Sequence, residues 1–91
     1  MNNIDLSIII PVYNVENYLR RGLDSILLQP SSITYEILLI DDGSSDKSGA
    51  ICDEYQSNFQ NVFVSHIENN GVAEARNLGI SLSKGNYLYF M

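Results

Sequence analysis

Cysteine, proline and basic residues are scarce in this 91-residue sequence, which has one cysteine, two prolines and five lysines and arginines. A single cysteine, Cys52, can form neither an internal disulfide nor a cysteine-based metal cluster, so we expect a packed structural thiol there. The formal net charge of −6 argues against nonspecific binding to nucleic acid, because such binding requires a basic surface. An anionic ligand would therefore depend on a few placed cations or on a metal ion.

Long hydrophobic segments are also missing. The longest apolar run is far too short to span a bilayer, and no cationic segment precedes the first one, as a signal peptide would require. We therefore expect the given residues to be soluble and cytoplasmic, with peripheral attachment to a membrane left open for a full-length protein. Repeats and low-complexity segments are absent, so residues 1–91 are interpreted as one domain.

Common nucleotide-binding and catalytic motifs are absent too. The first apolar run is followed by Tyr-Asn-Val-Glu at 13–16 rather than by Gly-x-Gly-x-x-Gly, which argues against a nicotinamide cofactor. No Gly-Lys-Ser phosphate loop, Gly-x-Ser-x-Gly elbow or histidine-rich metal cluster occurs. Phosphoacceptor receiver domains carry paired acids after their first strand, whereas the acidic pair of this chain follows the second, so that class is disfavoured.

The apolar residues that are present follow two periods. Continuous and β-branched runs predict strands at 6–12, 37–40, 62–66 and 87–91, and helical spacing predicts helices at 15–27, 46–59 and 72–82. The order β-α-β-α-β-α-β implies an α/β fold with a mostly parallel four-stranded sheet and right-handed crossovers. We expect the apolar stripe at 87–91 to belong to the core.

Polar residues follow the strands where they end. Asp41 and Asp42 come directly after the fully apolar second strand, and residues 43–46 suit a tight turn followed by a helix N-cap. Because the carboxyl ends of parallel strands share one edge of the sheet, residues 13–16 and 66–71 should lie beside them. Open parallel sheets bind ligands at this edge, so Asp41 and Asp42 are the first candidate ligand residues.

Four motifs stand in order along the chain: Ser-Ile-Ile-Ile-Pro-Val-Tyr-Asn at 7–14, Asp-Asp-Gly-Ser-Ser-Asp at 41–46, Asn-Gly-Val-Ala-Glu-Ala-Arg-Asn at 70–77 and Lys-Gly-Asn-Tyr-Leu-Tyr-Phe-Met at 84–91. Together they resemble the donor-binding half of family 2 glycosyltransferases of the GT-A fold. The last motif looks like the family's lead-in to its Asp-x-Asp metal motif. The resemblance implies a Rossmann-like GT-A half that stops after its fourth strand.

The resemblance also implies a ligand, a nucleoside diphosphate sugar that is usually a uridine one. A carboxylate only accepts hydrogen bonds, so Asp42 would accept the N3 hydrogen of uracil while Tyr13 packs on the ring. Arg76 is the best candidate cation for the diphosphate or the base edge, because a guanidinium binds such oxygens in pairs. The other residues expected at the nucleotide are Pro11, Asn14, Glu16 and Asp41.

The chemical machinery of the family is expected outside this chain. In the family a divalent ion, Mg²⁺ or Mn²⁺, bridges the Asp-x-Asp acids and the diphosphate, and a downstream carboxylate deprotonates the acceptor hydroxyl for an inverting transfer. We therefore assign no residue of this chain to catalysis or to a metal, and expect the chain alone to be inactive. The acceptor of a complete enzyme would be a sugar or a lipid-linked group. The open edge of the last strand is expected to invite self-association.

Structural roles remain open for the same residues. Asp42 suits a turn, Asp41 could bond loop amides, Glu16 could be a first-turn acid and Arg76 a solvated side chain. His66 at a strand end is more often a packing residue with satisfied hydrogen bonds than a base. The corresponding alternative function is a noncatalytic nucleotide-binding or interaction module.

Overall fold

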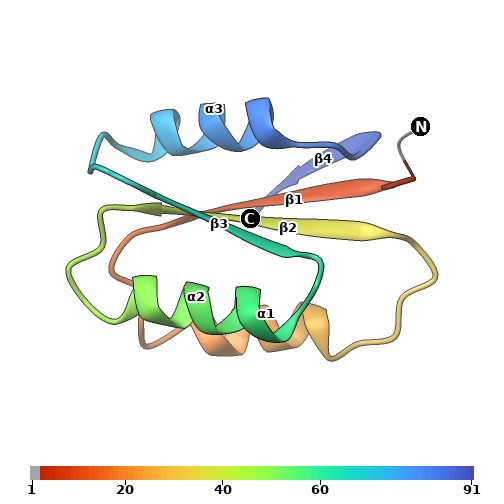
Figure 1. The fold of residues 1–91 in the computed structure, drawn as a ribbon, viewed down its shortest axis with the longest axis horizontal. Helices are drawn as coiled ribbons and strands as arrows, with labels where there is room; N and C mark the ends of the chain where they lie inside the picture. The colour runs from red at the N-terminus through yellow and green to blue at the C-terminus, as the bar shows by residue number, and fades with distance from the viewer. Residues whose placement is uncertain (1–2) are drawn as a thin grey trace.

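The computed structural model describes residues 3–91 as one sheet with helices on both faces (Figure 1). Its elements in chain order are β1 (Leu6–Val12), α1 (Leu19–Leu27), β2 (Tyr35–Asp42), α2 (Ser48–Asn58), β3 (Val62–Ile67), α3 (Val72–Leu82) and β4 (Tyr87–Phe90). All neighbouring strands pair in parallel, in the order β3-β2-β1-β4. The predicted alternation of strands and helices and the parallel four-stranded sheet are confirmed.

The two faces of the sheet are covered by different helices. α1 and α2 lie on one face, and α3 lies on the other (Figure 1). Successive side chains of a strand point to opposite faces, so Ile8 and Ile10 pack toward α1 and α2, while Ile9 between them packs toward α3. This alternation continues along β2 and decides where its two aspartates point.

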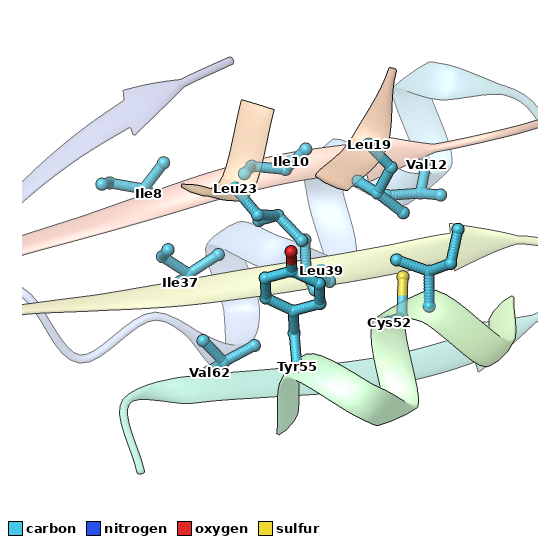
Figure 2. Packing of buried hydrophobic residues seen from close by; sticks show 11 residues of the cluster. Ile8, Ile10, Val12, Leu19, Leu23, Ile37, Leu39, Cys52, Tyr55 and Val62 are labelled. Carbon is cyan, nitrogen blue, oxygen red and sulfur yellow. The ribbon is translucent and has the colours of Figure 1, made fainter. Parts of the chain in front are cut away.

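The larger core lies between the sheet and the pair α1 and α2 (Figure 2). Cys52 is fully buried there, which confirms the predicted structural thiol, and burial raises its pKa to about 12. The ring of Tyr55 stacks on Phe59 with centroids 5.9 Å apart. The buried members of this core are Ile8, Ile10, Val12, Leu19, Leu23, Ile37, Leu39, Ile51, Cys52, Tyr55 and Val62.

The smaller core joins α3 to β1 and β2, with Ile9, Leu38, Ile40 and Ala75 as its buried members. Gly79 of α3 is also buried in this contact. A Cβ atom at Gly79 would lie 2.4 Å from Cγ2 of Ile9, far inside van der Waals contact. The glycine therefore allows α3 to approach the middle of β1.

Element ends differ from the sequence prediction where contacts between loops decide them. β2 extends from Tyr35 through Asp42, rather than over residues 37–40, because both aspartates pair in register with β3. α1 begins at Leu19 instead of residue 15, after a turn in which Val15 C=O accepts the N–H of Leu19. α2 begins at Ser48, and Asp46 accepts the Ser48 N–H at 2.8 Å from just outside the helix.

The expectation that the last apolar stripe belongs to the core is wrong. Every residue of β4 is exposed, by fractions from 41% at Phe90 to 74% at Tyr87. β4 is the edge strand beside β1, and α3 packs on β1 and β2 instead. No helix within residues 3–91 is long and apolar enough to cross a membrane.

Candidate functional site

A pocket of about 330 Å³ opens where β1 and β2 end and α3 begins. The residues lining it are Pro11, Val12, Tyr13, Val15, Asp42, Asn69, Gly71 and Val72. Tyr13 is half exposed, with 49% of its surface accessible, whereas Asp42 is only 4% exposed. The pocket thus combines apolar walls, an accessible aromatic ring and a nearly buried carboxyl group, at the edge where parallel sheets bind ligands.

Asp42 fixes the loop that forms one wall of this pocket. Its Oδ1 accepts the N–H of Asn70 at 2.8 Å, and its Oδ2 accepts the N–H of Gly71 at 3.0 Å. Gly71 has φ of +97°, a conformation that favours glycine, and it directly precedes α3. A carboxylate can accept about four hydrogen bonds, so these two leave Asp42 able to accept another from a ligand.

Asp41 points to the opposite face of the sheet, as the alternation along β2 requires. Its Oδ1 accepts the Ser44 N–H at 3.1 Å, and its Oδ2 lies 2.7 Å from Nδ1 of His66. Burial alone would raise the pKa of the Asp41 carboxyl, but the hydrogen bonds from Ser44 and His66 outweigh burial and lower it. A Cβ atom at Gly49 would lie 2.9 Å from Asp41 Oδ2, so glycine is needed for this approach of α2.

The loop after β1 is bonded to the loop after β2. Asn14 Oδ1 accepts the N–H groups of Ser45 at 2.8 Å and Asp46 at 3.3 Å, while the Asn14 N–H donates to Ser44 Oγ at 3.1 Å. The Glu16 N–H donates to Asp46 Oδ2 at 3.1 Å. Asn14 adopts φ of +51°, which asparagine tolerates better than most residues. These contacts hold the backbone next to Tyr13 in place.

Three of the seven predicted site residues line the pocket, namely Pro11, Tyr13 and Asp42. Asn14 and Glu16 contribute loop-to-loop hydrogen bonds, and Asp41 lies beneath the turn on the other face. Arg76 is exposed on α3, one helical turn beyond Val72 of the pocket. Residues four apart share a helix face, so Arg76 lies on the side of α3 that carries Val72.

The sequence prediction missed two features of this region. Val72 lines the pocket although the sequence assigned it only to a helix, whereas Asn69 belongs to the segment 66–71 that was expected at this edge. His66 is bonded through both ring nitrogens, to Asp41 and to Asp53 of α2, so its polar groups are satisfied as expected. Its side chain is 46% exposed, so it is not packed in the core. Within residues 3–91 no group of three or more His, Cys, Asp and Glu side chains is arranged to hold a metal ion.

Comparison with known proteins identifies the family to which this arrangement belongs. The sequence model named Glycosyl transferase family 2 matches residues 7–91, which include all three loops around the pocket. This chain belongs to glycosyltransferase family 2. The family 2 chain is 44% identical to glycosyltransferase GlyA of Streptococcus pneumoniae over 86 residues, which cover 94% of the chain and 12% of GlyA. It is also 38% identical to the minor teichoic acid biosynthesis protein GgaB of Bacillus subtilis, covering 98% of the chain and 10% of GgaB.

A solved structure confirms the fold of the family 2 chain. TarS residues 1–349 of Staphylococcus aureus, in complex with UDP-GlcNAc, superimposes with a TM-score of 0.85 at 29% identity, covering 97% of this chain and 26% of TarS. The chain has the Rossmann-like half of the GT-A fold, as the resemblance implied. It spans between a tenth and about a quarter of the length of these relatives.

Proposed function

We propose that the pocket binds the nucleotide of a uridine diphosphate sugar, and that the chain is the donor-binding part of an inverting glycosyltransferase. The observation that carries this proposal is the placement of Asp42 and Tyr13 in one pocket at the carboxyl edge of the sheet. It is supported by the complex of TarS with UDP-GlcNAc, in which a similar fold binds that donor.

The two side chains have complementary chemistry for uracil. Tyr13 offers an accessible ring on which a base can stack, and Asp42 retains acceptor capacity after bonding Asn70 and Gly71. Uracil presents an N3 hydrogen that a carboxylate accepts, whereas cytosine presents an acceptor at N3. Cytosine would leave two acceptors facing each other in a nearly buried site, at a cost of about 1–3 kcal/mol.

The diphosphate requires positive charge, which this acidic chain supplies sparsely. Arg76 is the candidate, because its guanidinium has no hydrogen-bond or ion-pair partner among residues 3–91 and it lies one turn along α3 from the pocket. A guanidinium binds phosphate oxygens in pairs. Pro11 would shape the base pocket, while Asn14, Glu16 and Asp41 would maintain it through the loop contacts described above.

The remaining parts of the reaction are proposed for a longer protein. A divalent ion would supply charge neutralisation of the leaving diphosphate, but residues 3–91 offer no ligand set for it, so its ligands would belong to that longer protein. β4 runs parallel to β1, and the Met91 N–H donates to Ile9 C=O. Residues that follow Met91 would thus run toward the pocket edge. The acceptor would be a sugar or lipid-linked group in polysaccharide biosynthesis at the cytoplasmic side of a membrane.

Calorimetric titration with three ligands tests the base assignment. We expect UDP to bind more tightly than CDP and than UDP methylated at N3, by about fivefold to a hundredfold, because one buried acceptor loses its partner. Asp42→Asn should reduce the preference for UDP over CDP. Equal binding of UDP and its N3-methyl analogue would contradict the role of Asp42.

A matched pair of tyrosine variants tests the stacking role. Tyr13→Ala should weaken UDP binding by about fivefold to a hundredfold, the value of one stacked base. Tyr87→Ala removes a tyrosine that is 74% exposed at the other end of β1, where it pairs with Leu6, and should leave the affinity unchanged. Equal effects of the two variants would argue against the pocket.

The alternative of a noncatalytic binding module would be excluded by sugar transfer or donor hydrolysis.

A further inference from the structure

His66, the only histidine of the sequence, lies between carboxylates from two different elements. It lies near the end of β3 in register with Asp41 of β2, and its Nδ1 is 2.7 Å from Asp41 Oδ2. Its Nε2 is 2.7 Å from Oδ1 of Asp53 on α2. Ionised carboxylates only accept hydrogen bonds, and neutral imidazole has a single N–H. With both carboxylates ionised, only the imidazolium form satisfies both contacts.

A continuous set of hydrogen bonds connects this histidine to the pocket. Asp41 uses one oxygen for His66 and the other to accept the Ser44 N–H. Ser44 Oγ in turn accepts the N–H of Asn14. Asn14 directly follows Tyr13, whose ring lines the pocket. Through these bonds the side chain of His66 stabilises the turn at Ser44, and this turn holds the loop at residues 13–16, called here the Tyr13 loop.

The charges around the ring favour its protonated form. Hydrogen bonds to Asp53 and then to Asp41 raise the pKa of His66 above its ordinary value of 6.5. These carboxylates are the charged groups that face the ring from α2 and from β2, and the Cys52 thiol near them stays neutral, with a pKa of about 12. Stabilisation by His66 is therefore complete below about pH 6.5 and is lost as the pH rises through the raised pKa.

We propose that His66 is a positioning residue of the donor pocket: as an imidazolium between Asp41 and Asp53, it fixes the Asp41–Ser44 turn and thereby the Tyr13 loop. The proposal rests on the proposed function for its effect on ligand binding. Deprotonation removes one of the two contacts of the ring. We expect donor affinity to fall by about threefold to tenfold on deprotonation, the value of one hydrogen bond.

Nuclear magnetic resonance titration of the free 91-residue chain tests the first half of the proposal. As the chain has one histidine, its imidazole signals are unambiguous. We expect the amide signals of Ser44 and Asn14 to change with the same midpoint as the ring. Asp53→Asn should move all three midpoints to lower pH, because the ring loses one carboxylate partner. The control Glu54→Gln alters the next residue of α2, which pairs with Arg20 instead, and should move none.

The effect of His66 on ligand binding is tested by the affinity for UDP, measured from pH 5.5 to 9 on the wild-type chain, Asp53→Asn and Glu54→Gln. The ionisation of the UDP phosphates is common to all three, so a difference between their midpoints belongs to the protein. We expect the affinity midpoint to move to lower pH in Asp53→Asn and to stay in place in Glu54→Gln. A purely structural role of Asp53 would weaken binding equally at every pH.

The possible failures are distinguishable. Amide signals of Ser44 and Asn14 that ignore the ring titration would overturn the positioning role, whether or not UDP binds. UDP affinity that shows no step at the His66 midpoint would overturn it as well, while leaving the proposed function intact. If UDP binds at no pH, the proposed function fails, and the amide titration alone decides whether His66 positions the turn.

Discussion

Two glycine-to-alanine substitutions provide a quantitative test of the packing of α3 on the sheet. Gly79 of α3 and Gly22 of α1 are both inside helices. A Cβ atom at Gly22 would meet nothing within 4 Å, whereas at Gly79 it would lie 2.4 Å from the buried Ile9 side chain. The same chemical change therefore meets open space in one helix and a closed contact in the other.

The expected magnitudes follow from helix propensity and overpacking. Alanine is favoured over glycine in a helix by about 0.8–1 kcal/mol, so Gly22→Ala should raise the free energy of unfolding by up to about that amount. Gly79→Ala gains the same propensity, but ordinary contact begins near 3.4 Å, so α3 or Ile9 must move by about 1 Å. Overpacking of this kind costs about 1–3 kcal/mol. We expect Gly79→Ala to be less stable than Gly22→Ala by that cost.

Urea unfolding followed by circular dichroism measures both variants. The difference between their free energies of unfolding cancels the propensity gain and isolates the contact with Ile9. If Gly79→Ala were as stable as Gly22→Ala, the close approach of α3 to β1 would be wrong. The wall of the pocket formed by Val72 belongs to the same helix, so its position would be in doubt as well.

Two further predictions concern the opposite end of the sheet and its edge. Glu36 is buried and accepts hydrogen bonds from Ser7 Oγ at 2.6 Å and from the Lys84 N–H at 2.7 Å. Glu36→Ala should therefore lower the free energy of unfolding by about 1–3 kcal/mol, and Glu36→Gln should lower it less. Equal losses for the two variants in urea unfolding would refute the hydrogen-bonding role of Glu36. All four residues of β4 are exposed at the sheet edge, so the chain should self-associate at high concentration in light scattering. Leu88→Lys should reduce this self-association because edge lysines block strand pairing. A wild-type chain that stays monomeric throughout would contradict that expectation.

Local patterns were sufficient for the elements with a strong period. The β-branched run Ile8, Ile9 and Ile10 predicted a strand, and the structure has one there whose two faces are covered by helices. α3 was predicted with its observed ends, because the turn before it and the apolar spacing within it are both local signals. The starts of α1 and α2 were less accurate, since the loops at Asn14 and Asp46 bond to each other across about thirty residues.

The sequence by itself determined the α/β class, the parallel sheet and the edge at which its strand ends gather, because alternating strands and helices permit few arrangements. It also placed Asp41 and Asp42 at that edge. Only the tertiary structure decided that the two carboxylates point to opposite faces of the sheet, where Asp42 lines the pocket and Asp41 contacts His66. The pairing of Asp53 with His66 and the exposure of β4 depend on register and neighbouring elements. Such contacts join residues far apart in the chain, so no local pattern encodes them.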